Sequence, residues 1–266
     1  MKPSIITLLT DFGTRDHYVA SMKGVILTLN PRCTLVDMTH QVTPHDVEEA
    51  AFLLANSYSC FPKGTIHLCV VDPGVGSPRR AILMMAGDHF FVGPDKGLFT
   101  LVAWRENIEG VIALTHPRFF LPSVSATFHG RDIFAPVAAH LSLGVKPQAF
   151  GSRMEDWVKL RVPQPTHREE KLLGEIIHID AFGNLITNVR EQGLSEFIRG
   201  GSPVIRVGRR TLRGIRKGYW EGETSEPMAL IGSSGFLEIS IRGGNAQKAL
   251  RLKKGDKIQI AIEKGR

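Results

Sequence analysis

Three side chains able to polarise or deprotonate water stand in loops of the first half of the sequence. Asp72 and Arg79 share the segment VVDPGVGSPRR, and His129 lies in ATFHGRDIFAP. An aspartate, an arginine and a histidine that meet at one edge of a sheet could orient a water molecule and remove its proton. A single histidine is more often a structural residue, so this hypothesis requires all three to converge. The glycine loop before Arg79 lacks the spacing and the Lys-Ser/Thr ending of a P-loop, which argues against triphosphate binding.

A further acidic residue follows the first apolar run, where Asp11 lies in the turn sequence Thr10-Asp11-Phe12-Gly13. A carboxylate at such a point can accept hydrogen bonds from both hydroxyls of a ribose. The alternative is an aspartate that only caps its own turn. From Asp11 alone, the turn-capping interpretation is preferred.

Polar turns in the second half form another cluster, within HIDAFGNLITNV and ALIGSSGFLEISIRGGNA. The amide of Asn184 could hydrogen-bond an adenine edge, or it could simply belong to a Gly-Asn turn. Ser233 and Ser234 could bind a carboxylate or only close a hairpin. Both alternatives stay open at this point.

The elements needed to position these side chains follow from the apolar periodicity. Residues 1–150 alternate strand and helix signals, including a strand over SIITLL, a helix from Tyr18 to Leu29 that ends at Asn30-Pro31, and a continuous apolar strand over TIHLCVV. Apolar strands that alternate with helices predict an α/β domain with a mainly parallel sheet. In such sheets, ligands bind beyond the carboxyl ends of the strands, which is where Asp11 and Asp72 fall.

The pattern changes in the second half. Residues 151–171 are rich in proline, charged and polar residues and are expected to form a linker. In residues 172–266 the helical period largely disappears, and short strands alternate with glycine turns. We therefore expect a smaller all-β barrel as the second domain.

Composition places the chain among ordinary globular proteins, since 42% of its residues are hydrophobic and 22% are charged. Three cysteines without a CxxC pair, and an N-terminal apolar run too short for a signal peptide or a membrane span, favour a cytoplasmic protein with no membrane partner. A formal net charge of +7 raises the possibility of a polyanionic partner, and much of it lies between Arg206 and Trp220. Because these basic residues alternate with Val207, Leu212 and Ile215, a solvated hairpin face is preferred to a nucleic-acid site.

Taken together, the motifs resemble those of one family, the S-adenosylmethionine hydroxide adenosyltransferases, which are related to fluorinating and chlorinating enzymes that use the same substrate. The resemblance spans nearly the whole chain. It is carried by TDFGTRDHYVASMKGVI, TPHDVEEAA, VVDPGVGSPRRA, VGPDKGLFT, TFHGRDIFAP, IDAFGNLITN, and SSGFLEIS with GNA. The family's fold, an α/β domain followed by a smaller β-barrel, agrees with the division drawn from the sequence pattern.

The resemblance implies hydrolysis of S-adenosylmethionine to adenosine and methionine, with no metal or cofactor besides that substrate. It assigns Asp72, Arg79 and His129 to water activation, a set that the halogenating relatives lack. It assigns substrate contacts to the following residues: Asp11 to the ribose, Asn184 and the backbone near Ala246 to adenine, Asp180 to the methionine ammonium, Ser233 to its carboxylate, and Phe128 and Trp220 to the nucleoside, although both aromatics are also explained as core residues. The halogenating relatives carry an arginine where Ser234 stands, which leaves the carboxylate contact less defined.

The family resemblance also implies a homotrimer whose active sites lie at subunit interfaces, between the first domain of one chain and the second domain of a neighbour. Two other hypotheses stay open. One is a sensor that binds S-adenosylmethionine or nucleosides with little turnover, and the other is a nucleic-acid-binding barrel that uses the basic stretch. The second predicts binding that weakens steeply with salt.

Overall fold

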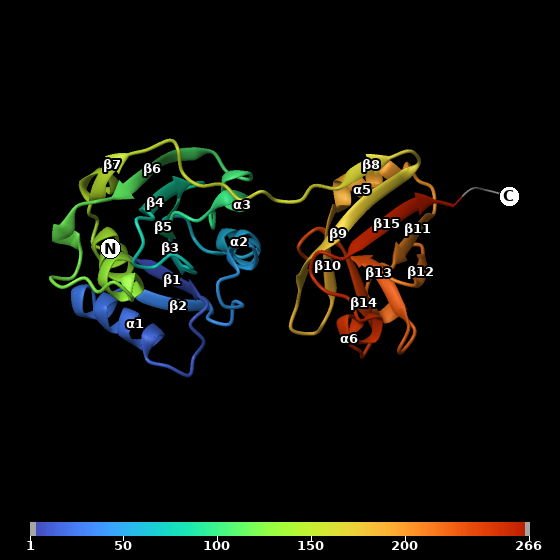
Figure 1. The fold of residues 1–266 in the computed structure, drawn as a ribbon, viewed down its shortest axis with the longest axis horizontal. Helices are drawn as coiled ribbons and strands as arrows, with labels where there is room; N and C mark the ends of the chain where they lie inside the picture. The colour runs from blue at the N-terminus through green and yellow to red at the C-terminus, as the bar shows by residue number, and fades with distance from the viewer. Residues whose placement is uncertain (1–3, 264–266) are drawn as a thin grey trace. The chain divides into compact units, whose positions relative to one another are not determined.

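The computed structural model describes residues 4–263, and the chain divides into two compact units, residues 1–160 and residues 161–266. The first unit combines helices with a twisted sheet, and the second consists mainly of strands (Figure 1). The division agrees with the expectation of an α/β domain followed by a mainly β domain.

A seven-stranded sheet forms the centre of the first unit, with the strand order β2-β1-β3-β5-β4-β6-β7. Its strands are β1 Ile5–Thr10, β2 Thr34–Thr39, β3 Ile66–Val70, β4 Ala81–Ala86, β5 His89–Pro94, β6 Ile108–Leu114 and β7 Gly151–Arg153. Strand β3 is buried along its whole length, as its continuous apolar sequence predicts for a central strand covered on both faces.

The sheet is mixed, and the expectation of a mainly parallel sheet is only partly met. Strands β2, β1, β3 and β5 are parallel neighbours, whereas β5, β4, β6 and β7 pair antiparallel. The physical reason is the turn between β4 and β5, where Gly87 and Asp88 both adopt positive φ, at 59° and 64°. Two such residues form the tight hairpin turn that forces adjoining strands to run antiparallel.

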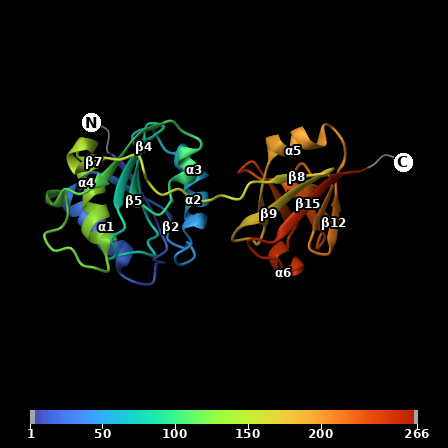
Figure 2. The same ribbon diagram turned by 45° about the horizontal axis from the view of Figure 1, so that its top comes forward.

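Helices cover both faces of this sheet (Figure 2). They are α1 Tyr18–Leu29, α2 Val47–Ala55, α3 Thr100–Ala103 and α4 Ala135–Ser142, with shorter helical turns η1 Tyr58–Cys60, η2 Pro117–Phe119, η3 Gly130–Phe134 and η4 Pro147–Phe150. Helix α1 has the predicted bounds, because the apolar period starts at Tyr18 and Asn30-Pro31 prevents its continuation. Two apolar cores result, one under α1 and α4 and the other under α2 and α3.

A buried pair of histidines lies within the second of these cores. His67 is fully buried, with Nδ1 2.8 Å from Thr7 Oγ1 and Nε2 3.3 Å from His89 Nδ1. Tyr58 packs edge-on against both rings and donates its hydroxyl to Glu106 at 2.6 Å. Burial, with a smaller contribution from His89, lowers the pKa of His67 to about 3.

We expect acid to destabilise the protein through His67. An unfolded histidine titrates near 6.5, so between that pH and about 3 the unfolded state binds a proton that the folded state does not. The neutral ring therefore makes its full contribution to the free energy of unfolding above about pH 6.5, and this contribution is lost as the pH falls. Urea titrations at a series of pH values should show a weaker pH dependence of the unfolding free energy in His67→Gln than in the wild type. His167→Gln, at an exposed position, should keep the wild-type dependence, and equal slopes in all three proteins would contradict the assignment.

The segment expected as a linker, residues 151–171, contributes strands to both sheets. Residues 151–153 form β7, and Thr166–Arg168 form β8 in the second unit. Residues 154–160 pack on the first unit, where Trp157 is buried and the backbone N–H of Val158 donates to Asp95 at 2.7 Å. The division into units accordingly falls after Leu160.

The second unit is an eight-stranded antiparallel sheet that is nearly closed into a barrel. Seven strands follow the order β12-β11-β15-β9-β10-β14-β13, and β8 pairs with β9. Their bounds are β9 Lys171–Ile179, β10 Leu185–Arg190, β11 Pro203–Val207, β12 Arg210–Arg213, β13 Pro227–Ile231, β14 Phe236–Ile241 and β15 Lys257–Ile262. A bridge between Arg216 and Leu230 brings the chain after β12 against β13, so the first and last strands of this order approach each other.

The second unit is not purely β, which corrects the expectation of an all-β barrel. Helix α5 spans Glu191–Ile198, α6 spans Ala246–Leu250, and a helical turn η5 spans Tyr219–Glu221. Helix α5 is short and contains Gly193, which weakens its sequence signal, and it is held by the burial of Leu194 in the barrel core. Within residues 4–263, no helix is long and apolar enough to cross a membrane.

Candidate active site

Asp11 and Asp72 come close to each other because their strands are neighbours in the first sheet. Asp11 follows β1 and Asp72 follows β3 by two residues, and these strands pair in parallel. The carboxyl ends of parallel strands share one edge of a sheet, so both carboxylates reach the same pocket. His129 approaches this edge from the start of the helical turn η3.

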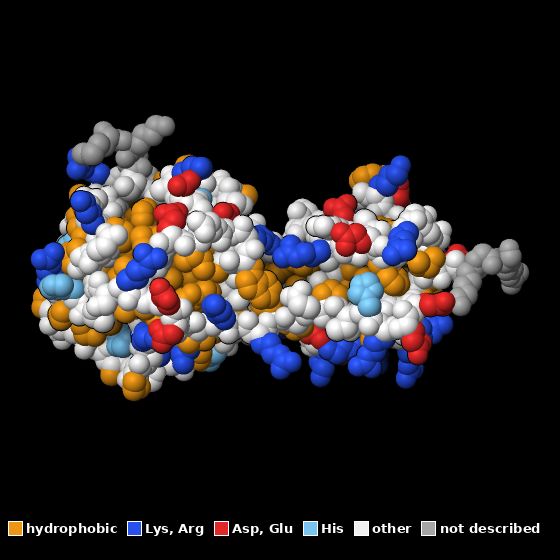
Figure 3. All heavy atoms as spheres, turned by 90° about the horizontal axis from the view of Figure 1, so that it is seen from above, with side chains coloured by type: hydrophobic (Ala, Val, Ile, Leu, Met, Phe, Trp, Pro, Cys, Tyr) orange, Lys and Arg blue, Asp and Glu red, His pale blue; other side chains and the backbone are white. Residues whose placement is uncertain are grey.

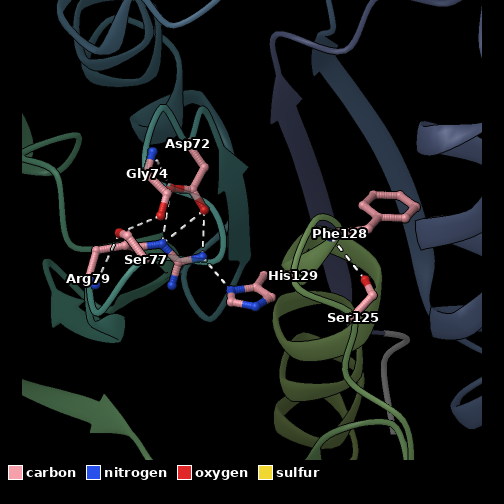
Figure 4. Close-up of polar contacts among 7 residues, drawn as sticks. All are labelled: Asp72, Gly74, Ser77, Arg79, Ser125, Phe128 and His129. Atoms are coloured by element: carbon pink, nitrogen blue, oxygen red, sulfur yellow. Dashed lines mark hydrogen bonds and ion pairs between the residues drawn. The ribbon is translucent and has the colours of Figure 1, made fainter.

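Asp72, Arg79 and His129 form one continuous chain of hydrogen bonds (Figure 4). Arg79 Nε donates to both Asp72 oxygens, at 3.0 and 2.9 Å, and Nη2 donates to Asp72 Oδ2 at 2.5 Å. The same Nη2 lies 2.7 Å from His129 Nδ1. The structure therefore brings together the three side chains that the sequence separates by up to 57 positions, and the arginine stands in the middle.

This ion pair is buried, since only 5% of the Asp72 side chain and 4% of the Arg79 side chain are exposed. The Arg79 guanidinium also lies over the ring of Phe134, 5.2 Å from its centroid. Removing two charges from water is costly unless they are paired and hydrogen-bonded, so each partner depends on the other.

The contact with Arg79 fixes the protonation of His129. A guanidinium only donates hydrogen bonds, so Nδ1 accepts and carries no proton, which leaves the ring proton on Nε2. Burial, followed by the positive charge of Arg79, lowers the pKa of His129. At neutral pH the histidine is therefore uncharged, and its basic nitrogen is occupied by the arginine.

A pocket of about 330 Å³ opens beside this chain of hydrogen bonds. Asp72 and His129 line it, whereas Arg79 lies behind them. The residues that line the pocket are Asp11, Phe12, Tyr18, Pro44, His45, Val70, Asp72, Val75, Thr127, Phe128, His129 and Gly130. Phe128 is 7% exposed, so it is both a core residue and part of the pocket wall.

Three aromatic rings form the apolar wall of the pocket. The Phe128 ring centroid lies 6.0 Å from that of Phe12 and 5.1 Å from that of Tyr18, both nearly edge-on. Phe12, Tyr18 and His45 line the pocket without having been predicted as site residues. A signal for two of them was present, because Phe12 lies within the first turn motif and Tyr18 begins the helix that follows it.

Asp11 is held by the backbone of a neighbouring loop. Its Oδ2 accepts the N–H of His45 at 2.8 Å, and His45 adopts a left-handed φ of 69° that non-glycine residues rarely adopt. The turn that carries Asp11 is fixed by Thr10 and His40: Thr10 Oγ1 lies 2.8 Å from His40 Nδ1, and the Gly13 N–H donates to the His40 carbonyl at 2.7 Å. Asp11 is therefore preorganised at the pocket edge.

In the second unit, Asp180 and Asn184 close one tight loop. Asp180 Oδ1 accepts the backbone N–H groups of Phe182 and Asn184, each at 2.9 Å, and Oδ2 accepts the Asn184 side-chain amide at 2.8 Å. Asn184 is 6% exposed, and part of its amide is already committed to Asp180. Phe182, which was not predicted as a site residue, lies in this loop and is 77% exposed.

The motif around Ala246 lies against this loop. The Gln247 N–H donates to the Gly183 carbonyl at 2.9 Å, and Gly183 packs so closely on Asn245 that a side chain would not fit there. Ala246 itself is fully buried at the first position of α6. The structure thus brings together the motifs IDAFGN and GNA within the second unit.

The remaining predicted contact residues are more exposed. Ser233 lies exposed in the turn between β13 and β14, and Trp220 is 69% exposed, which excludes a core role for that ring. Next to it, Tyr219 donates its hydroxyl to the buried Glu238 at 2.7 Å.

The basic stretch forms the hairpin of β11 and β12 that its alternation predicts. Val207 and Leu212 point into the barrel core, whereas Arg206, Arg210 and Arg213 are exposed. Of the chain's 33 basic and 26 acidic residues, residues 1–160 hold 14 and 14, and residues 161–266 hold 19 and 12. The positive excess therefore belongs wholly to the second unit, where basic side chains gather along one side (Figure 3).

Groups of three or more histidine, cysteine, aspartate or glutamate side chains in positions to bind a metal ion do not occur within residues 4–263.

These observations define a two-domain protein with a buried Asp-Arg-His chain beside an aromatic pocket. Comparison with known proteins then identifies the family to which the chain belongs. The family model of the SAM hydroxide adenosyltransferase N-terminal domain matches residues 6–151, and that of the C-terminal domain matches residues 174–259. The chain therefore belongs to the S-adenosylmethionine hydroxide adenosyltransferase family, as its motifs predicted.

Individual relatives align over almost the whole chain. The (R)-S-adenosyl-L-methionine hydrolase of Thermus thermophilus is 37% identical over 98% of this chain and 100% of its own. The fluorinase of Nocardia brasiliensis is 25% identical over 97% of each chain. A crystal structure of an uncharacterized conserved protein from Thermotoga maritima superposes with a TM-score of 0.90 at 37% identity, covering 96% of this chain and 99% of the other.

Proposed function

We propose that this protein hydrolyses S-adenosylmethionine to adenosine and methionine by attack of an activated water molecule at the ribose C5′. The observation that carries the proposal is the buried chain Asp72–Arg79–His129, of which the two outer members line the pocket. Relatives that are 34–37% identical over nearly their full length and are named (R)-S-adenosyl-L-methionine hydrolases support it.

In this proposal Asp72 accepts the proton of the water. Arg79 has no lone pair to offer, and the only unprotonated ring nitrogen of His129 already accepts a hydrogen bond from Arg79. Asp72 is the remaining group that can accept a proton, and it lines the pocket; besides Arg79, its Oδ1 accepts the Gly74 N–H at 3.3 Å. Arg79 holds the carboxylate in place, and His129 holds Arg79 from the other side.

The reaction balances without any further reactant. The water oxygen forms a bond to C5′, the C5′–S bond breaks with its electron pair passing to sulfur, and neutral methionine thioether leaves. The proton passes to Asp72 and then to solvent. As the water oxygen gains negative charge, it approaches a positively charged sulfonium, so charge is neutralised in the transition state. The apolar aromatic wall of the pocket therefore favours this reaction more than bulk water does.

The remaining predicted contacts complete the proposal. Asp11 binds the ribose hydroxyls and Phe128 packs on the nucleoside, while Asn184, the backbone near Ala246, Asp180, Ser233 and Trp220 contact the adenine and methionine parts. Phe182 is exposed beside Asn184, so its ring offers an aromatic surface against which a planar ligand can stack. Asp180 is already committed to three donors of its own loop, so its role in orienting Asn184 is at least as important as an ammonium contact. The homotrimer implied by the family resemblance stays a prediction.

The experiment that tests the proposal is a product assay in ¹⁸O-labelled water. Purified protein with S-adenosylmethionine should release methionine and adenosine, and mass spectrometry should find one ¹⁸O atom in the adenosine. From a mixture of the two sulfonium epimers, only the R form should be consumed, as the names of the relatives indicate. Tight binding measured by calorimetry without product over hours would instead support the sensor hypothesis.

Asp11→Ala is expected to weaken substrate binding much more than turnover. Loss of hydrogen bonds to a charged group costs about 1.5–3 kcal/mol, so KM should rise by roughly 10- to 100-fold while kcat stays within a few-fold. The wild type should also discriminate against a substrate that lacks the ribose 2′-hydroxyl, and the variant should not. Steady-state kinetics with both substrates check this, and undiminished discrimination in Asp11→Ala would remove the ribose role.

A further inference from the structure

We propose that Asp132 is a positioning residue of the water-activating site, acting through Ser125 on His129 and Phe128. The inference rests on the proposed function and extends it, because the motif ATFHGRDIFAP then contributes Asp132 to the site in addition to Phe128 and His129. Asp132 does not line the pocket. Its effect is therefore transmitted through the residues it holds.

Asp132 is a buried carboxylate, and both of its oxygens accept hydrogen bonds. It is 0% exposed and lies in the helical turn η3 that begins directly after His129. Its Oδ2 accepts both the N–H of Ser125 at 2.8 Å and the Ser125 hydroxyl at 2.7 Å, and Oδ1 accepts Arg131 Nε at 2.6 Å. A buried charge is tolerated only with such partners, so the position of Ser125 is tightly coupled to that of Asp132.

Ser125 in turn contacts the pocket residue Phe128. Its hydroxyl oxygen accepts the N–H of Phe128 at 3.1 Å (Figure 4), and Phe128 directly precedes His129 in the chain. The hydroxyl can serve Phe128 as an acceptor because its own proton is donated to Asp132. A path therefore runs from Asp132 through Ser125 to the backbone of Phe128 and so to its neighbour His129, which contacts Arg79.

The turn that Asp132 stabilises is of an unusual kind. Residues 130–134 form a π-helical turn, a geometry that is rare and frequently found at functional sites. Asp132 holds this turn through its side chain and also through its backbone carbonyl, which accepts the Leu121 N–H at 2.9 Å. The side chain and backbone of one residue thus tie the loop 121–128 to the turn that presents His129.

The test compares Asp132→Ala and Asp132→Asn with a stability-matched control. Asparagine keeps one oxygen that can accept both Ser125 donors, so Asp132→Asn should retain kcat within a few-fold. Asp132→Ala should lower kcat by roughly 10- to 100-fold, because misplacement of catalytic groups by about 1 Å has effects of this size. The control is Tyr58→Phe, which removes a buried hydrogen bond in the other core and should leave kcat unchanged.

A double-mutant cycle with His129→Ala separates a positioning role from a general loss of stability. If Asp132 acts through His129, Asp132→Ala should lower kcat much less in the His129→Ala background than in the wild type. Equal fold losses in both backgrounds would overturn the proposal. Should Asp132→Ala fail to fold, Ser125→Ala takes its place in the cycle, because it removes the hydroxyl link and leaves the buried carboxylate paired with Arg131.

A readout independent of turnover separates this proposal from the proposed function. In ¹⁵N spectra of labelled protein, His129 should show a neutral ring with its proton on Nε2, and Asp132→Ala should shift these ring signals while Tyr58→Phe should not. Unchanged His129 signals in Asp132→Ala would overturn the positioning role even in an active enzyme. Shifted signals in a protein without turnover would support the positioning role and count against the hydrolase.

Discussion

Asp72→Asn should lower kcat by about 10²- to 10⁴-fold while the dissociation constant of S-adenosylmethionine stays within a few-fold. The substitution keeps the shape of the side chain and one oxygen to accept from Arg79. It removes the negative charge and the capacity to accept a proton from water, because an amide is not a base at neutral pH. Single-turnover kinetics and calorimetry on the same preparation measure the two quantities.

A neighbouring pair provides the control for Asp72→Asn. Asp156 accepts two hydrogen bonds from Arg80, each at 2.9 Å, and its side chain is 81% exposed. Asp156→Asn therefore removes an aspartate from an arginine pair outside the pocket and should leave kcat unchanged. Wild-type turnover in Asp72→Asn would refute Asp72 as the proton acceptor.

Arg79→Met should damage both stability and activity. It leaves the Asp72 carboxylate buried without its counter-ion, which costs about 3–5 kcal/mol of unfolding free energy for a pair of this burial. It also removes the link between Asp72 and His129, so kcat should fall by at least the roughly 10²-fold expected for a misplaced catalytic group. Urea titration and the product assay measure the two effects.

A second substitution separates the two consequences of Arg79→Met. In Asp72→Leu/Arg79→Met both charges are replaced by apolar groups of similar volume, a change that is often neutral or stabilising for buried pairs. The double variant should therefore be more stable than Arg79→Met alone and should still lack turnover. If the double variant were no more stable than the single one, the buried charge would not be the origin of the destabilisation.

Local sequence determined much of the fold. Helix α1 has the bounds that its apolar period and Asn30-Pro31 predict, and β3 is the central buried strand that its unbroken apolar run predicts. The division into an α/β unit and a mainly β unit also follows from local periodicity. Helical and strand-like repeats of apolar residues alternate in the first half of the chain, whereas strand-like repeats predominate in the second. The sheet is only partly parallel, because the two-residue turn Gly87-Asp88, with positive φ at both positions, makes β4 and β5 an antiparallel hairpin.

Sequence also determined where the candidate site lies. Asp11 and Asp72 follow strands, and the carboxyl ends of parallel strands meet at one edge whatever the details of packing. The proximity of Asp72, Arg79 and His129 was predicted through the family resemblance, and the structure brings these three side chains into contact.

The tertiary structure alone decided what each side chain can do there. Only the packed fold shows that Arg79 lies behind Asp72 and His129, that this contact fixes the proton of His129 on Nε2, and that Asp132 supports Ser125. Such properties depend on burial and on hydrogen bonds between segments distant in sequence, as between Arg79 and His129. Local propensities carry no information about these contacts, because the same residue in the same turn can be a solvated cap or a buried partner depending on what packs against it.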